Sequence, residues 1–266
     1  MFKPALGAAV LFLAACAGGG PAAPLPPAAA PVRFLLSFDD GPAPSSAQVL
    51  EALADNPVQP GIKAIFFVQT RAPDAGGSPE GFDLMRREYA EGHVLGVHTG
   101  TALGHVSHMA LSPEELERSL EQAKADIAAA TGALPRFVRP PFWFYDAEAL
   151  QCYGRSGLAM LLTDIKALDG VVLGINVIPG KRYLIRSQLE RIKRELEEGA
   201  LPSLDGATPV VATFHDVNTS TARDLREYLQ MLVEESRAAG LSLAQHPYYD
   251  RREDLERAAR LRARQL

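Results

Sequence analysis

Short apolar segments alternate along this chain with longer stretches in which apolar and polar residues follow a helical period. The apolar segments predict strands at 32–38, 93–98, 137–139, 158–163 and 210–214. The amphipathic stretches predict helices at 112–131, 146–155, 187–199 and 219–239. This alternation is typical of parallel strands joined by crossover helices. A length of 266 residues with 47% hydrophobic content, and no internal repeat, is sufficient for one catalytic domain.

Polar residues stand at the carboxyl ends of several predicted strands. They are Asp39, Asp40, His98, Arg139 and His215. Neighbouring residues within a strand point to opposite faces, but where the chain leaves the sheet both aspartates can point into one cleft. Two close carboxylates repel each other unless a cation or an arginine compensates. Because a βα barrel carries its catalytic groups at strand ends and in the following loops, the pattern favours an active site over a solvated turn.

The histidines near these strand ends are candidate metal ligands. His98, His105 and His108 follow one predicted strand, and His215 follows another. Together with Asp40 they offer the nitrogen and oxygen ligands that a first-row divalent ion takes. We therefore predict a divalent metal cofactor, with Zn²⁺ preferred.

Four short motifs, in fixed order, resemble those of one enzyme family. They are Ser-Phe-Asp-Asp-Gly-Pro at 37–42, His-Thr at 98–99, Arg-Pro-Pro at 139–141 and Thr-Phe-His-Asp at 213–216. These segments are similar to motifs of the NodB-type polysaccharide deacetylases, carbohydrate esterase family 4. The resemblance runs from about residue 33 to residue 245. It implies an α/β fold, a distorted and incomplete (β/α) barrel.

The resemblance also implies an activity, the metal-dependent removal of acetyl groups from N-acetylated amino sugars of a polysaccharide. By that resemblance Asp40 and His98 bind the metal. Asp39 is the general base, and His215 is the general acid that gives a proton to the departing nitrogen. Arg139 pairs with Asp39 and orients it, because a guanidinium group suits a carboxylate.

The third metal ligand departs from the family pattern. The family places its second histidine four residues after the first, where this chain has Ala102. His105 and His108 are the alternatives. Measured back from Leu-Ser-Pro-Glu-Glu at 111–115, His105 has the expected distance, so we prefer His105 and read His108 as a neighbour or a surface histidine.

The residues that follow Arg-Pro-Pro, and one further family motif that comes between Arg-Pro-Pro and Thr-Phe-His-Asp, fit the family pattern loosely. The resemblance makes the backbone N–H of Phe142 an oxyanion donor, but Trp143 stands where the family usually has Gly. The four aromatic residues at 142–145 could form a sugar-stacking wall or could be packed core. The fourth motif, two acids spaced three apart, has a partial counterpart at 164–169, and we assign Asp164 as the partner of Arg139.

The first residues predict a targeting segment. A short positive start, an apolar run and Leu-Ala-Ala-Cys at 13–16 are typical of a bacterial lipoprotein signal, with residues 1–15 removed and Cys16 lipidated. Residues 16–31, rich in Pro and Ala, then form a tether. We expect an anchored envelope protein, on the periplasmic face of the outer membrane because Ala17 follows the cysteine. The rest divides into a deacetylase domain at 32–249 and a charged, solvated helix at 250–266.

The overall charge restricts the partners. A net charge of −5 argues against nucleic acid and against a strongly anionic substrate. The resemblance implies an acetylated polysaccharide or oligosaccharide as the substrate, and the signal pattern implies contact with the membrane through a lipid anchor. Cys152 alone remains in the predicted domain, so no disulfide within it is available, and a buried thiol is expected. Other functions remain open: a catalytically silent carbohydrate-binding lipoprotein, an O-acetyl esterase of the xylan type, or a phosphatase with an Asp nucleophile.

Overall fold

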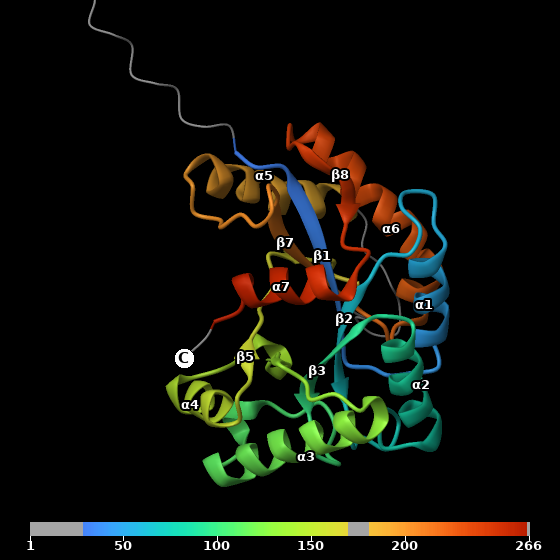
Figure 1. Cartoon of the computed structure of the whole chain (residues 1–266), viewed down its shortest axis with the longest axis vertical. Coiled ribbons are helices and arrows are strands. Elements are labelled where there is room, and N and C mark those ends of the chain that lie inside the picture. The colour runs from blue at the N-terminus through green and yellow to red at the C-terminus, as the bar shows by residue number, and fades with distance from the viewer. Residues whose placement is uncertain (1–28, 170–180, 265–266) are drawn as a thin grey trace, which may run out of the picture.

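A curled sheet of parallel strands forms the centre of the molecule, with helices around it (Figure 1). The computed structural model describes residues 29–169 and 181–264. In these ranges the strands are β1 (Val32–Asp39), β2 (Ala64–Gln69), β3 (Val94–Thr99), β4 (Phe137–Val138), β5 (Ala159–Met160), β6 (Ile165–Lys166), β7 (Thr208–His215) and β8 (Leu243–Tyr248). The helices are α1 (Ser46–Ala54), α2 (Pro79–Ala90), α3 (Pro113–Thr131), α4 (Ala147–Arg155), α5 (Lys181–Glu197), α6 (Thr219–Ala238) and α7 (Arg252–Arg262), with short 3-10 turns η1 (His108–Ala110) and η2 (Pro141–Trp143).

The strand order shows that the barrel does not close. Hydrogen-bonded neighbours follow the order β5-β4-β3-β2-β1-β7-β6, and β8 pairs with β1 outside this path. In the described ranges, the strands of this sheet pair in parallel, as crossover connections require. Because β5 and β6 lie at opposite ends of the order, the sheet forms a curled half-barrel. The distorted, incomplete (β/α) barrel expected from the sequence is confirmed.

The alternation of β1 separates the two faces of this sheet. Phe34 and Leu36 belong to the outer hydrophobic core, which they share with residues of α1 and α6. Leu35 belongs to the inner core, which it shares with α7. Ser37 and Asp39 continue the row of Leu35, because side chains two residues apart lie on the same face. The inner face therefore changes along the strand from apolar to polar and ends at a carboxylate.

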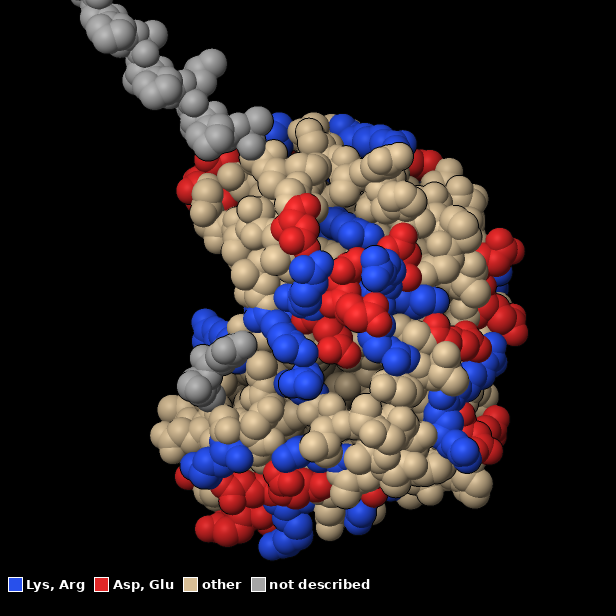
Figure 2. Space-filling model, in the orientation of Figure 1, with Lys and Arg blue, Asp and Glu red and all other residues tan. Residues whose placement is uncertain are grey.

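The C-terminal helix α7 is part of the packed structure. The prediction of a solvated helix is corrected, because Leu255, Ala258 and Ala259 are buried in the inner core. Figure 2 shows acidic and basic side chains gathered over the outer side of this helix. Arg262 reaches inward and binds Asp164 at 2.6 Å, with both side chains largely buried. The buried face of α7 packs with Leu35 and Val211 in this inner core, so the helix covers the apolar part of that face of the sheet.

Local sequence signals placed most of the helices correctly. Ser112 caps α3 in a capping box with Glu115, and α6 matches its expected range to within one residue. Helix α5 already includes Lys181, the first described residue after position 169, which lies six residues before the predicted start at Ser187. The buried positions of α5 continue upstream of Ser187 to Ile185, so its apolar face begins earlier than the cap-like serine indicated.

Several predictions fall on other parts of the chain. The signal segment, the lipidated Cys16 and nearly all of the tether lie outside the described residues. None of the helices in the described part combines the length and the apolar character needed to cross a bilayer. Cys152 is buried in α4, as expected.

Glu88 is a fully buried acid on the inward face of α2. Within the described ranges, neither of its carboxylate oxygens has a hydrogen-bond partner. Burial raises the pKa of Glu88 well above its ordinary value, and the charges of Asp216 and Glu91 raise it further. The folded chain therefore holds a proton here that the unfolded chain releases at lower pH.

We expect Glu88→Gln to be more stable than the native chain at pH 8. The pKa of Glu88 is higher in the folded chain than in the unfolded chain. Its contribution to the free energy of unfolding is therefore largest below the unfolded pKa near 4.5, and it falls as pH rises toward the folded pKa. The amide cannot ionise, so Glu88→Gln should gain stability relative to the native chain as pH rises from 5 to 8. Urea unfolding at pH 5 and pH 8 tests this. Equal pH dependence in both proteins would contradict the buried, protonated state.

Candidate active site

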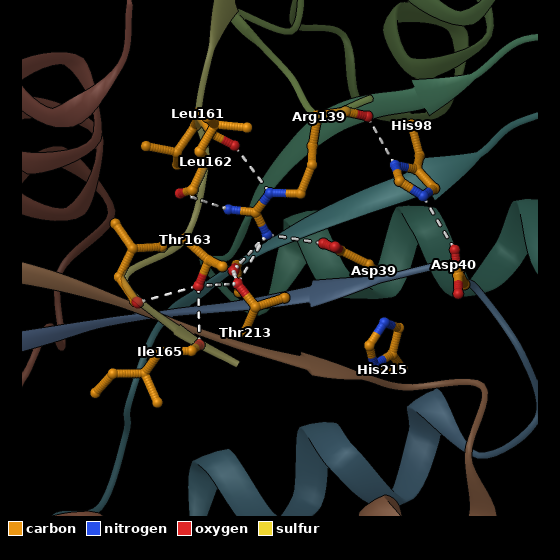
Figure 3. A network of polar contacts seen from close by, with 12 residues as sticks. Asp39, Asp40, His98, Arg139, Leu161, Leu162, Thr163, Ile165, Thr213 and His215 are labelled. Atoms are coloured by element: carbon orange, nitrogen blue, oxygen red, sulfur yellow. Dashed lines mark hydrogen bonds and ion pairs between the residues drawn. The ribbon is translucent and has the colours of Figure 1, made fainter. Parts of the chain in front are cut away.

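The strand ends of β1, β3, β4 and β7 bring five residues together (Figure 3). Strands β1 and β7 pair in parallel along their full length, so that Asp39 lies directly beside His215. Asp40 follows Asp39, His98 lies near the end of β3, and Arg139 directly follows β4. All five residues predicted from strand ends therefore meet at one edge of the sheet.

Asp39 and Arg139 form a buried ion pair. Arg139 Nη1 donates to Asp39 Oδ1 at 2.8 Å, and their side chains are 0% and 3% exposed. The same guanidinium donates through Nε to the carbonyl oxygen of Leu161 at 2.9 Å and through Nη2 to that of Leu162 at 3.2 Å. These fixed acceptors hold the guanidinium in one orientation, so Asp39 is aimed by a rigid partner.

Hydroxyl groups from three segments complete the surroundings of Arg139. Nη1 donates to Ser37 Oγ at 2.7 Å and to Thr213 Oγ1 at 3.1 Å. Thr213 also contacts Ser37 at 2.9 Å and Thr163 at 2.8 Å, as Figure 3 shows for Thr213 and Thr163. Thr213 opens the Thr-Phe-His-Asp motif at 213–216. The hydroxyl at this position serves the buried guanidinium, a role that sequence reasoning missed.

Asp164 does not pair with Arg139, and this prediction is corrected. Its Oδ1 binds Arg262 of α7, and its Oδ2 accepts the backbone N–H of Val211 at 2.8 Å. The loop after β5 turns this carboxylate toward the C-terminal helix and the β7 backbone. Asp164 therefore links α7 to β7. Apart from Asp39, the acceptors of the Arg139 guanidinium are backbone carbonyl oxygens and hydroxyl groups.

Asp40, His98 and His105 form a compact group of three candidate ligands. Asp40 Oδ1 lies 3.0 Å from His98 Nε2 and 3.2 Å from His105 Nε2, and ligand atoms of the three lie within 4.8 Å of one another. The structure thus brings His105, rather than His108, to Asp40. Asp40 has a φ of 75°, a left-handed conformation that is uncommon for a residue other than glycine and asparagine.

A cation fits this group. His98 Nδ1 lies 2.8 Å from the carbonyl oxygen of Arg139, and because a carbonyl can only accept, Nδ1 carries the hydrogen. His98 Nε2 then presents a lone pair toward Asp40 Oδ1. Both atoms are buried, and neither has a hydrogen-bond partner in the described part of the chain. Two buried acceptors at 3.0 Å are compatible when a positive ion stands between them, with His98 held by its other nitrogen.

The electrostatics of the group show that Asp40 is ionised when positive charge lies beside it, a role that protonated histidines or a bound cation can fill. Burial by itself would raise the pKa of Asp40, but the contact with His98 and the charges of His98, His105 and His215 outweigh it and lower the pKa to about 2. Burial lowers the pKa of His105, although the Asp40 charge opposes this. An ionised carboxylate and a neutral imidazole are the forms that bind a divalent ion.

His108 lies behind the site. Its Nδ1 is 2.7 Å from the Tyr153 hydroxyl, and its Nε2 is 3.0 Å from the carbonyl oxygen of His98. Burial lowers the pKa of His108 to about 3, and the His98 charge lowers it further. A neutral His108 therefore supports the backbone of His98 and is not directed at Asp40.

Gly41 and Asp216 fix the turn that carries Asp40. Asp216 is fully buried, and its Oδ2 accepts a hydrogen bond from the Ser46 hydroxyl. A Cβ atom at Gly41 would lie 2.2 Å from this same oxygen, so only glycine fits there. The close approach ties the loop after β1 to the loop after β7.

His215 is held by Asp169, which sequence reasoning passed over in favour of Asp164. Asp169 Oδ1 lies 2.8 Å from His215 Nδ1, and Oδ2 accepts the His215 backbone N–H at 2.8 Å and the Thr221 hydroxyl at 2.7 Å. Burial by itself would lower the pKa of His215, but the bond to Asp169 and the charges of Asp169, Asp39 and Asp40 outweigh it and raise the pKa to about 9. His215 is therefore a protonated donor at neutral pH, with Nε2 free of the Asp169 bond.

We expect Asp169→Asn to lower the pKa of His215 from about 9 to the ordinary value near 6.5 or below. The amide removes the negative charge that raises the pKa, while burial still disfavours the imidazolium. NMR titration of the His215 ring measures the change. Asp224→Asn, which replaces an acid on the outer surface, serves as the control and should leave the His215 pKa unchanged. An unshifted pKa in Asp169→Asn would contradict the pairing.

The loop after Arg-Pro-Pro has an unusual backbone. Phe142 and Trp143 both have positive φ, 59° and 66°, which glycine adopts without strain and these residues do not. The Trp143 ring lies 5.1 Å from the Arg139 guanidinium, and Lys166 Nζ lies 5.0 Å from the same ring. These cation–π contacts help to hold the strained loop. Trp143 and Tyr145 are half-buried, whereas Phe142 and Phe144 are exposed, so the four aromatics are not packed core alone.

The site residues share one cavity. A pocket of about 340 Å³ is lined by Asp39, Asp40, His98, His105, Pro140, Phe142, Trp143, Phe144 and His215. It contains a carboxylate beside an arginine, a protonated histidine and a group able to hold a cation. A larger cavity of about 680 Å³ lies at the amino ends of β3 and β4 and contains none of these residues.

Comparison with known proteins agrees with this arrangement. A family model described as polysaccharide deacetylase matches residues 29–161. The chain is 30% identical over 139 residues to a chitin deacetylase of Pestalotiopsis sp, covering 52% of this chain and 44% of that protein. It is 33% identical over 108 residues to a peptidoglycan-N-acetylglucosamine deacetylase of Bacillus cereus, covering 40% of this chain and 35% of that protein. The chain thus spans less than half the length of these relatives.

A solved structure supports the fold. The chitin deacetylase from Colletotrichum lindemuthianum has a TM-score of 0.60 and 24% identity, over 81% of this chain and 85% of that one. At this identity the likeness shows the fold alone. The same curled half-barrel therefore exists in a solved protein.

Proposed function

Because the chain belongs to the polysaccharide deacetylase family, we propose that it removes acetyl groups from N-acetylated amino sugars of an envelope or exported polysaccharide. The observation that supports this most is the pocket shared by the Asp39–Arg139 pair, the protonated His215 and the Asp40-His98-His105 group. Amide hydrolysis needs a base for water, a stabilised oxyanion and a proton for the leaving nitrogen. This pocket offers a residue for each need.

Asp40, His98 and His105 would hold a divalent metal, for which Zn²⁺ is the proposed ion because two imidazoles and a carboxylate suit it. Such an ion, when bound, lowers the pKa of its water and polarises the acetyl carbonyl. Three protein ligands leave room for a water or a substrate oxygen, as in catalytic sites of this kind. The His98 imidazole is kept in its binding tautomer by the Arg139 carbonyl.

Asp39 is the proposed general base. The ion pair with Arg139 fixes the orientation of the Asp39 carboxylate. Asp39 lines the pocket together with its neighbour Asp40. The oxygen that does not bind Arg139 can accept a proton from the attacking water. The Phe142 N–H, at the pocket wall, is the proposed donor to the oxyanion that forms on the acetyl carbon.

His215 is the proposed general acid. Asp169 binds Nδ1, so Nε2 carries the proton that can pass to the sugar nitrogen as the C–N bond breaks. Its pKa of about 9 keeps that proton in place at neutral pH. Asp39 and His215 lie side by side at the ends of adjacent strands, which supports the proposal that a base and an acid act on the two sides of one substrate amide.

Acetate release tests the proposal. N-acetylglucosamine oligomers, peptidoglycan and O-acetylated xylan are incubated with the zinc-loaded protein and with a chelator-treated sample. We expect acetate from an N-acetylated polymer and its loss on chelation. Release from xylan alone would favour an O-acetyl esterase. Binding of glycan without any acetate release would favour a silent carbohydrate-binding protein.

We also propose that Cys16 is lipidated and anchors the protein in the cell envelope, at the periplasmic face of the outer membrane. The support is the Leu-Ala-Ala-Cys pattern at 13–16 after an apolar run. Cys16→Ser should move the protein from the membrane fraction to a soluble or uncleaved form. Fractionation with an antibody to the protein measures this, and unchanged membrane association of Cys16→Ser would contradict lipidation.

A further inference from the structure

Four rings form a continuous file that leads from the candidate metal group to the surface. Ring centroids are 5.2 Å apart for His98 and His105, 4.2 Å for His105 and Phe142, and 6.3 Å for Phe142 and Phe144. Exposure rises along the file, from 2% and 33% for the two histidine side chains to 48% and 61% for the two phenylalanines. The outer rings therefore present apolar faces to solvent directly beside the pocket.

Exposure of the Phe142 and Phe144 rings to water is unfavourable in free energy unless a ligand covers them. Phe144 is among the most exposed large hydrophobic residues in the described part of the chain, and it lines the same pocket as Asp39 and His215. Phe142 and Trp143 in the η2 loop have positive φ angles. The backbone is therefore strained in the segment that carries these rings. Strain and apolar exposure at one place mark a binding surface.

We propose that Phe142 and Phe144 form a stacking subsite for the sugar units next to the one that loses its acetyl group. The inference rests on the proposed function, because it assumes a glycan in the pocket. A pyranose whose ring substituents are all equatorial presents axial C–H groups on its faces, which pack on an aromatic ring. The ligand class is therefore a gluco-configured chain of at least two units.

The charge of the surroundings is consistent with a neutral chain. Of the residues that line the pocket, Asp39 and Asp40 are acidic and the protonated His215 offsets one of these charges, while Phe142 and Phe144 at the outer end carry none. An anionic polymer would gain nothing at Phe144 and would meet a protein of net charge −5. Stacking, rather than ion pairing, is then the source of affinity for the flanking sugars.

The test compares substrates of increasing length. We measure kcat/KM for acetate release from N-acetylglucosamine oligomers of two to five units with the zinc-loaded native protein, Phe144→Ala and Phe144→Trp. We expect the native protein to favour the pentamer over the dimer about tenfold, which corresponds to about 1.4 kcal/mol. Phe144→Ala should lose most of this preference and keep its rate on the dimer, and Phe144→Trp should restore it.

A matched control shows whether the effect of Phe144→Ala is specific to the subsite or follows from the loss of any exposed apolar side chain. Leu134 is 66% exposed and precedes β4, at the opposite end of that strand from Phe144. Leu134→Ala should behave as the native protein at every length. An equal preference for the pentamer in Phe144→Ala and the native protein would overturn the subsite, and so would an equal loss on dimer and pentamer.

A binding measurement distinguishes failure of the subsite from failure of the proposed function. Trp143 is the only tryptophan of the chain and lines the pocket, so its fluorescence reports occupancy. Pentamer binding should be about tenfold weaker in Phe144→Ala than in the native protein, whether or not acetate is released. If no oligomer loses acetate but this difference in binding is found, the deacetylase proposal fails and the subsite stands. Equal binding by both proteins overturns the subsite.

Discussion

Asp39→Asn is expected to lower the rate of acetate release by about 10²–10⁴-fold, the usual contribution of a general base. The amide keeps the size of the side chain and can still accept the hydrogen bond from Arg139 Nη1, which is 2.8 Å away in the native protein. It cannot take a proton from water. The three candidate metal ligands are unchanged, so bound zinc should remain stoichiometric.

The measurement pairs steady-state acetate release with elemental analysis of the same sample. Asp74→Asn, which replaces an exposed acid in the loop before α2, is the control and should keep full activity and metal. Near-normal turnover of Asp39→Asn would remove the base assignment. Loss of zinc from Asp39→Asn would mean that Asp39 also serves the ion.

Loss of one candidate ligand is expected to yield metal-free protein at micromolar zinc. Asp40→Ala, His98→Ala and His105→Ala each remove one of three ligand atoms that lie within 4.8 Å of one another. An open site with three protein ligands cannot spare one, so both zinc and acetate release should be lost. Zinc content after gel filtration measures the first, and the acetate assay the second.

His108→Ala is the matched comparison for His105→Ala. His108 contacts the His98 carbonyl and the Tyr153 hydroxyl, so its removal loosens the support of a ligand without removing one. We expect zinc to remain, with affinity or activity reduced by about 10–100-fold, the usual effect of a supporting residue. The reverse pattern, with zinc retained by His105→Ala and lost by His108→Ala, would contradict the ligand set.

The sequence by itself determined many of the elements and most of the strand-end chemistry, whereas β2, β8, α1 and α2 were not predicted from it. Apolar runs such as 32–38 and 210–214 and the Ser112 capping box are local signals, because a strand or a helix start depends on residues a few positions apart. Asp39 and His215 stand at the ends of such runs. Once parallel strands are assumed, their carboxyl ends must share an edge, and the site follows.

The tertiary structure alone decided which loop residues enter the site. Asp164 precedes the short strand β6 and Asp169 follows it, and the sequence offers either as the acid of the site. Packing of α7 draws Asp164 to Arg262, whereas the turn at Leu168, with φ of 52°, precedes the Asp169 that binds His215. A side chain on an irregular loop takes its direction from distant contacts, which no local pattern records.

The same reason separates His105 from His108 and explains the burial of α7. Spacing along the chain favoured His105, but only the fold shows His108 enclosed by Tyr153 beneath the His98 backbone. The charged pattern of 250–266 indicated a solvated helix, yet the half-barrel leaves an apolar inner face that Leu255 and its neighbours cover. Local periodicity determines where elements begin and end, and long-range packing determines which of their faces and loops are enclosed.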